Sequence, residues 1–266
     1  MHRRIRLAAC AAAAVVASSL SAGAAPVGIE GFDYPDGTVV DQLGGTGWAY
    51  ERTEEPASLP SSPSDWDLAG GTANVVGGTL VTTGGGARRQ FNGPTEGSAA
   101  GSNEREGAFR GAGTVFFGVD MTRQAGADWS GVSSFDFANE RLFFGVPSGQ
   151  AFFGISENGV GRTVSTTLQP EAGQTYRIVA EVNFDADEVR MWVNPGAGDQ
   201  ATPHLTRPYT ATNWSTAVRL ASGGTGSTTW DNLVVATDWN DPGLVPEPGS
   251  LALLGLGAIG MLRRRR

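Results

Sequence analysis

The chain has no lysine, and after its first 25 residues it has no cysteine and a single histidine, His204. Without cysteine the main part of the chain can form neither a disulfide framework nor a cysteine-ligated metal site. One histidine argues against zinc, which takes three or four His, Cys or carboxylate ligands in one place. No G-x-S-x-G motif accompanies His204, so nothing indicates a serine hydrolase.

Basic charge is concentrated at the two ends, with three arginines in the first six residues and four in the last four. All 19 basic residues are arginine, and all 27 acidic residues lie between Glu30 and Glu247. Without the terminal arginines the central segment has 12 arginines against 27 acids, a net charge near −15. Such an acidic body has no electrostatic attraction for nucleic acid or anionic lipid, and we expect no nucleic-acid partner.

Residues 1–25 have the pattern of a secretory signal peptide. Arg3, Arg4 and Arg6 precede an apolar run, and small residues follow up to Ala25. This order predicts export, with cleavage near Ala24 or Ala25 and loss of Cys10. The letters around Cys10 fit a lipobox, but too few apolar residues precede it. Arg3-Arg4 fits a twin-arginine signal only loosely.

The other end combines a proline motif, an apolar run and an arginine cluster. Pro246-Glu247-Pro248 precedes the 12 apolar residues of Leu251–Leu262, which Arg263, Arg264, Arg265 and Arg266 follow. As a helix this run would be about 18 Å long, which is marginal for a bilayer core of about 30 Å. Snorkelling arginines would bring it closer to spanning, and they predict a cytoplasmic end. The alternative is a packed C-terminal helix, but the run has no polar face.

These three parts, in this order, resemble the PEP-CTERM sorting signal of exported bacterial proteins. The resemblance implies that an integral-membrane exosortase recognises Pro246-Glu247-Pro248, with Arg263–Arg266 as membrane anchor. It implies secretion across the inner membrane and transient anchoring by the C-terminal helix. Delivery to the cell surface or extracellular matrix would follow, in a bacterium that has an outer membrane and makes exopolysaccharide.

The body of the chain reads as one all-β domain, because short β-rich runs end at Gly, Pro, Asn or Asp and no window holds a helical period. The clearer runs are Thr114–Met121, Val132–Phe137, Arg141–Val146, Ala151–Ser156, Arg162–Leu168, Thr175–Phe184, Glu188–Val193, Val218–Ala221 and Thr228–Ala236, and weaker ones are Ile29–Tyr34, Thr72–Val76, Thr79–Thr83 and Arg88–Phe91. About a dozen short strands predict a two-sheet antiparallel sandwich. The strongest local prediction is a hairpin from Thr175 to Val193, with its turn at Asp185-Ala186-Asp187.

Scattered short motifs resemble LamG-like, concanavalin A-like domains. They are Glu30-Gly31-Phe32-Asp33-Tyr34-Pro35, Gly44-Gly45-Thr46-Gly47-Trp48, Arg190-Met191-Trp192-Val193-Asn194-Pro195 and Trp230-Asp231-Asn232-Leu233-Val234. The resemblance implies a jelly-roll sandwich whose first and last strands are neighbours, which would place Phe32 and Leu233 on one sheet. We therefore expect a signal peptide at 1–25, a LamG-like sandwich at 26–241 and a PEP-CTERM signal at 242–266.

Carboxylates give no catalytic pattern. Laminarinase-like enzymes carry E-x-D-x-x-E along one strand, and this run does not occur here. Asp185 and Asp187 lie in a predicted hairpin turn and are weak candidates for calcium, which takes oxygen ligands. Calcium is thus the only cofactor left open, and we expect no catalytic residues.

Exposed tryptophans are the remaining candidates for binding, because a flat aromatic face suits the C–H groups of a sugar. Trp129, Trp192 and Trp214 are the possible carbohydrate contacts. Trp192 is the most interesting, since strand alternation sets it opposite Val189, Met191 and Val193; the opposing interpretation is that it is core.

Three functions remain. We expect a non-catalytic cell-surface or extracellular-matrix protein associated with exopolysaccharide or biofilm. The alternative is a carbohydrate-binding, lectin-like module, and less favoured is a glycan hydrolase or lyase with an unrecognised pair of acids.

Overall fold

The computed structural model describes residues 26–46, 48, 65–91, 95–98, 105–110, 112–136, 139–209, 214–241 and 243–245. The predicted signal peptide, Pro246-Glu247-Pro248, Leu251–Leu262 and Arg263–Arg266 lie outside these residues. Within the described ranges no helix has the length and apolarity to cross a membrane.

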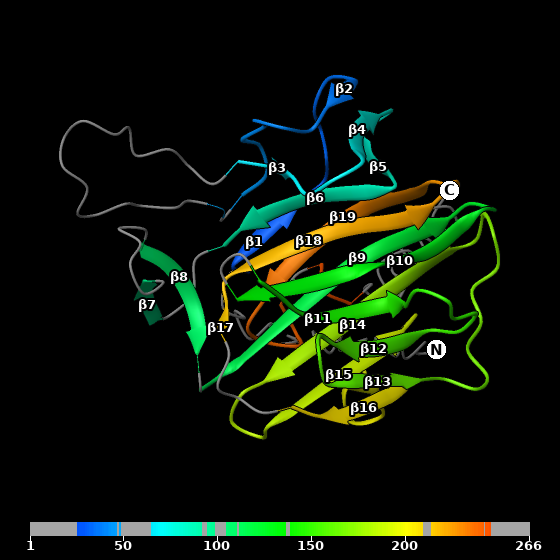
Figure 1. The fold of residues 1–266 in the computed structure, drawn as a ribbon. Coiled ribbons are helices and arrows are strands. Elements are labelled where there is room, and N and C mark those ends of the chain that lie inside the picture. The colour runs from blue at the N-terminus through cyan, green and yellow to red at the C-terminus, as the bar shows by residue number, and fades with distance from the viewer. Residues whose placement is uncertain are drawn as a thin grey trace, which may run out of the picture.

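Two antiparallel sheets pack face to face (Figure 1). Sheet A has nine strands in the order β16 (Leu205–Pro208), β15 (Glu188–Val193), β14 (Thr175–Asn183), β9 (Thr114–Arg123), β19 (Thr228–Ala236), β5 (Thr79–Thr83), β4 (Thr72–Val76) and β2 (Gly37–Thr38), with β1 (Gly28–Glu30) also paired to β19. Sheet B has seven, in the order β13 (Gly161–Val164), β12 (Gly154–Glu157), β11 (Asn139–Val146), β10 (Ala127–Asp136), β18 (Ala217–Gly224), β6 (Gly85–Gln90) and β3 (Asp67–Leu68). The predicted all-β, two-sheet antiparallel jelly-roll sandwich is confirmed.

A small third sheet lies beside the sandwich. It contains β7 (Thr95–Ser98), β8 (Arg105–Arg110) and β17 (Trp214–Ser215), and the described helical structure is one 3₁₀ turn at Asp199–Ala201. The sequence did not predict these strands, nor β2, β3 and β16. Most of them are only two to four residues long, and β16 is an edge strand that ends at Pro208, where a missing N–H is tolerated.

Side-chain alternation builds the core between the sheets. Val115, Phe117, Val119 and Met121 of β9 and Ile178, Ala180 and Val182 of β14 point inward and are fully buried. On β19 the register shifts between Asp231 and Val234, and Asn232 has φ 50°. This bulge changes the phase of the strand, so that Trp230, Leu233 and Val235 all reach the same core.

The first and last strands are neighbours, as expected. Glu30 of β1 pairs with Leu233 of β19. Phe32 lies just beyond the end of β1 and not on the sheet itself, but it shares the central core with Leu233. The β14–β15 hairpin is also confirmed. Val182 faces Val189 across it, and Asp187 takes the left-handed conformation, with φ 51°.

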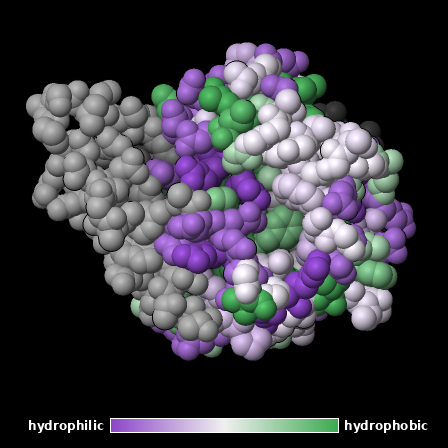
Figure 2. All heavy atoms as spheres, viewed as in Figure 1, coloured by the Kyte–Doolittle hydropathy of each residue, from purple (hydrophilic) through white to green (hydrophobic). Residues whose placement is uncertain are grey.

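Part of the outer face of sheet A, over β9, β14, β15 and β19, is covered by a later segment of the chain. Residues 237–241 and 243–245, which we call the stem, follow β19 and pack against Phe116, Val179, Trp192 and Val234. Leu244 and Val245 are buried in this second cluster, so the packed part of the chain extends beyond residue 241 to Val245. Elsewhere, Figure 2 shows a face of hydrophilic and intermediate residues with hydrophobic ones in small separate patches.

Candidate functional site

The stem removes Trp192 from the list of sugar contacts. As predicted, its side chain points away from Val189, Met191 and Val193, but it is 0% exposed. Its ring lies 4.9 Å from that of Trp239, and its indole N–H donates to the carbonyl oxygen of Asp199 at 2.9 Å. Trp192 is therefore core because a later segment covers its face of the sheet, and the expectation of a sugar contact there is corrected.

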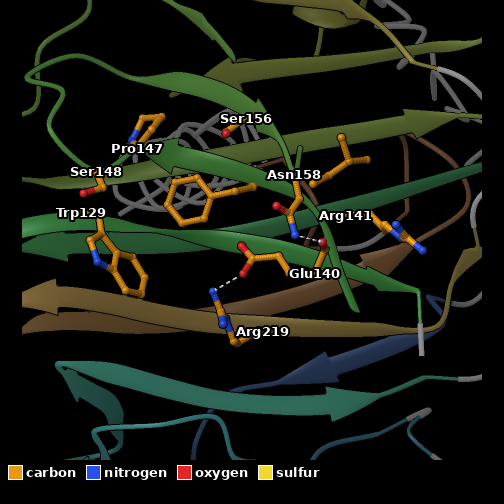
Figure 3. A pocket seen from close by; sticks show the side chains of 10 residues that line it. Trp129, Glu140, Arg141, Pro147, Ser148, Ser156, Asn158 and Arg219 are labelled. Carbon is orange, nitrogen blue, oxygen red and sulfur yellow. Dashed lines mark hydrogen bonds and ion pairs between the residues drawn. The ribbon is translucent and has the colours of Figure 1, made fainter. Parts of the chain in front are cut away.

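Trp129 is half-buried on the outer face of sheet B and lines a pocket of about 270 Å³ (Figure 3). We call this hollow the Trp129 pocket; Glu140, Arg141, Leu142, Phe143, Pro147, Ser148, Ser156, Asn158 and Arg219 complete its lining. No hydrogen bond of the Trp129 indole occurs among the described residues. Trp214 belongs to β17, where its backbone pairs with Arg110, and its side chain lies outside the description.

Two glycines form the floor beneath the aromatic rings. A Cβ atom on Gly223 would lie 1.8 Å from Nε1 of Trp129, and one on Gly131 would lie 2.5 Å from Cζ of Phe143. Both rings thus lie close against the backbone of the sheet. They meet edge to face, with centroids 6.0 Å apart at 74°. This contact fixes the Trp129 ring while part of it remains open to solvent.

An ion pair forms the polar side of the pocket. Arg219 of β18 donates from Nη2 to Oε2 of Glu140 on β11 at 2.7 Å, and the Ser133 hydroxyl donates to Oε1 of Glu140 at 2.9 Å. The Arg219 guanidinium carbon is 5.9 Å from the Trp129 ring centroid. Figure 3 shows Glu140 between Arg219 and Asn158, whose side-chain amide donates to the Glu140 backbone carbonyl at 3.1 Å.

The rim is held by further polar contacts. The Ser148 hydroxyl donates to Oδ2 of Asp128 at 2.9 Å, and the Arg162 guanidinium donates to the Ser148 carbonyl oxygen at 2.9 Å. Arg141 donates to Asp136 through Nε and Nη2, at 3.1 and 3.0 Å. The charged side chains that line the pocket are therefore paired within the protein.

The arrangement offers an apolar ring face beside fixed hydrogen-bonding groups. Glu140 is the one carboxylate among the residues that line the pocket, and both of its oxygens already accept hydrogen bonds. Glu140, Phe143 and Arg219 are not among the site residues that the sequence predicts. Glu140 and Phe143 lie on β11 and Arg219 lies on β18, on the two sides of β10, and no motif links these two strands along the chain.

The calcium candidates Asp185 and Asp187 accept hydrogen bonds from the backbone of other segments of the protein. Oδ1 of Asp185 accepts the Gly113 N–H at 3.0 Å, and the backbone carbonyl of Asp187 accepts the Tyr209 N–H at 2.8 Å. Across the described part of the chain, no group of three or more His, Cys, Asp or Glu residues is placed to hold a metal. Calcium binding by Asp185 and Asp187 stays an untested candidate.

Fold and pocket define a class: a two-sheet β-sandwich with a solvent-open aromatic pocket and a docked C-terminal stem. Residues 244–266 match the PEP-CTERM protein-sorting motif, which contains Pro246, Glu247, Pro248 and the four terminal arginines. The chain is therefore an exosortase-sorted protein destined for secretion or the cell surface. No curated protein matches its sequence.

Solved structures resemble the sandwich at low identity. Domain 4 of AbnA, a GH43 extracellular arabinanase from Geobacillus stearothermophilus in complex with arabinotriose, is 11% identical with a TM-score of 0.46, covering 81% of this chain and 93% of that one. Alginate lyase AlgAT5 of polysaccharide lyase family 7 is 11% identical with a TM-score of 0.42, covering 64% and 93%. Trypanosoma rangeli sialidase is 14% identical with a TM-score of 0.46, covering 79% of this chain and 30% of that one. Another sialidase is matched over 17% of its length, and at these identities the likeness concerns the fold alone.

Proposed function

We propose that this exosortase-sorted protein is a non-catalytic component of the cell surface or extracellular matrix, and that its Trp129 pocket binds a neutral glycan of the exopolysaccharide. The observation that carries the proposal is the Trp129 ring, held over Gly223 with part of its surface open. Sugar C–H groups stack on such a ring, and the adjoining Glu140, Asn158 and Ser148 offer partners for hydroxyl groups.

The pairing of charges favours a neutral sugar over a uronate. Arg219 is bonded to Glu140 and Arg141 to Asp136, so a ligand carboxylate would have to displace an internal partner. The central segment also carries a net charge near −15, which repels polyanions. Non-catalytic binding is favoured because glycoside hydrolysis generally uses two carboxyl groups flanking the bond, whereas the pocket lining supplies Glu140 alone.

The binding proposal is tested with a soluble neutral glucan and a neutral arabinan as probes, and with alginate as the polyuronate comparison. We expect saturable binding of a neutral probe, and at least about tenfold weaker binding in Trp129→Ala, as for a central aromatic contact. Gly223→Ala should weaken binding similarly, because the added methyl group would displace the Trp129 ring from its position, although the tryptophan itself is still present.

Val76→Ala is the matched control, since Val76 is an exposed apolar residue of β4 in the other sheet. Binding that survives both Trp129→Ala and Gly223→Ala would rule out the pocket. New reducing ends from any probe, or unsaturated uronates from alginate, lost in Glu140→Gln, would establish an enzyme instead.

Tail processing is tested separately. Glu247→Ala should leave export and folding intact but stop removal of the tail, so that full-length protein accumulates in the inner membrane. Replacing Arg263–Arg266 with serine should instead loosen anchoring and topology, because arginine is costly at the bilayer centre. Western blots of membrane and surface fractions distinguish the two. If the Glu247→Ala protein reaches the surface with the wild-type C-terminus, exosortase does not read this residue.

A further inference from the structure

The stem is held on sheet A by an aromatic cluster. The Trp239 ring contacts Trp192, with centroids 4.9 Å apart, and Phe116 edge to face at 6.1 Å. Its indole N–H donates to the carbonyl oxygen of Ala197 at 3.0 Å. Leu244 is fully buried. The stem therefore has the side-chain packing of a core element and is not a loose linker.

Arg177 of β14 binds the backbone of the stem. Its Nε and Nη2 donate to the Leu244 carbonyl oxygen at 3.1 and 3.0 Å, and Nη2 also donates to that of Gly243. Its Nη1 donates to the Asn232 carbonyl oxygen at 2.7 Å and to Asp120 at 3.2 Å. The guanidinium, which is 6% exposed, thus joins the stem to β19 and β9.

Gly118 of β9 makes room for this contact. A Cβ atom there would lie 2.6 Å from Nη2 of Arg177 and 2.9 Å from both Cδ1 and the carbonyl oxygen of Leu244. The backbone of Gly118 is not in the left-handed region, so an alanine would fit its conformation. The effect of this substitution would therefore come from the added methyl group, which would displace the Arg177 guanidinium and the Leu244 side chain from the outer face of the sheet.

The docked stem overlaps the sorting motif in sequence. The match to the motif begins at residue 244, and residues 244 and 245 are 0% and 8% exposed in the sandwich. Pro246 follows directly. A protease needs backbone that is exposed and free of internal hydrogen bonds, and it reaches packed backbone only through local unfolding. No free linker therefore separates the folded domain from the motif.

We infer that the packing of Arg177 and Gly118 against residues 243 and 244, which we call the Arg177 dock, is a stop for C-terminal processing. The dock shields the chain through Val245, so that cleavage occurs after this residue and the stem stays on the mature protein. The cleavage of the tail in cells rests on the proposed exosortase processing, whereas the shielding of residues up to Val245 is a property of the fold itself. It gives the fold, as well as the motif, a part in deciding where the mature protein ends.

The shielding is tested on the full-length chain in detergent micelles with proteinase K, followed by mass measurement of the products. Digestion of the wild type should stop at or after Val245. Gly118→Ala and Arg177→Ala should be cut within residues 239–245 at least about tenfold faster, because lost contacts raise the population of the locally open stem. Gly198→Ala and Arg190→Ala are controls: nothing lies within 4 Å of a Cβ at Gly198, and Arg190 pairs with Glu181 and Glu188.

Leu244→Ser alters the stem and leaves the sheet unchanged, so it replaces either variant if that one does not fold. Rapid removal of the stem from the wild type, or variants as resistant as the controls, would overturn the dock. In cells, the mature wild-type C-terminus should lie at or beyond Val245, with ragged ends inside the stem in the dock variants. A wild-type end inside the stem would overturn the stop. An intact tail in cells, with the proteinase K stop preserved, would support the dock and reject exosortase processing.

Discussion

At the scale of single residues, Glu30 is the centre of a buried polar cluster. It is buried, and its Oε2 accepts hydrogen bonds from Arg89 at 2.6 Å, from the Tyr34 hydroxyl at 2.5 Å and from the Trp66 indole at 3.2 Å. The Arg89 guanidinium carbon also lies 4.7 Å from the Trp48 ring centroid. A buried carboxylate is tolerated here because several donors share its charge.

Tyr34 in this cluster gives stability that depends on pH. Burial, followed by the hydrogen bond to Glu30, raises the pKa of Tyr34 from 10.0 to about 12. The folded state therefore favours the neutral phenol. Its stabilising contribution is complete below pH 10 and is lost as the pH rises through about 12. We expect the difference in unfolding free energy between the wild type and Tyr34→Phe to be constant below pH 10 and to shrink above it.

Denaturant unfolding across this pH range measures the difference, and ultraviolet titration should show a late phenolate step that Tyr34→Phe removes. Tyr176→Phe serves as the matched variant and should leave the late step in place. A stability difference that does not change with pH would show that the phenol proton plays no part.

At the scale of elements, positive-φ residues decide where strands turn or change phase. Asp187 closes the β14–β15 hairpin at φ 51°, Asn194 ends β15 at φ 52°, and Asn232 forms the bulge of β19 at φ 50°. Asp and Asn adopt this region more readily than other non-glycine residues. Each of these positions controls which side chains of the following segment face the core.

The hairpin turn gives a direct test. Asp187→Gly and Asp187→Ala remove the same carboxylate, but only alanine keeps the steric cost of the left-handed conformation. We expect Asp187→Ala to unfold about 1 kcal/mol more easily than Asp187→Gly, measured by thermal or urea denaturation. Equal stabilities would mean that the turn relaxes to another conformation.

At the scale of the whole molecule, the sandwich depends on the stem to cover its second core. A fragment of residues 26–245 should show sheet with little helix by circular dichroism and melt cooperatively. A fragment that ends at Ala236 would expose Trp192 and Phe116 and lose the packing of Trp239, Leu244 and Val245. We expect it to be less stable by at least about 3 kcal/mol, comparable to deleting a large buried side chain.

Metal dependence is a separate prediction for the same fragment. The melt of residues 26–245 should be unchanged by EDTA, because the acidic turns bond to the protein itself, as Asp185 does to Gly113. A melting temperature lowered by EDTA and restored by calcium would reveal a structural ion and reverse this expectation.

The sequence by itself determined the strand-rich fold, the hairpin at Asp187 and the C-terminal sorting motif, because local alternation, turn residues and linear motifs encode these features. The pairing of first and last strands was implied only by the resemblance to LamG-like domains. The sequence did not decide between Trp129 and Trp192, which both occupy outward-facing strand positions. Only the tertiary structure did so: the stem returns over sheet A and buries Trp192, while the Trp129 pocket stays open. The Glu140–Arg219 ion pair and the Arg177 dock were also decided only by the tertiary structure, because each joins segments that are far apart in the sequence.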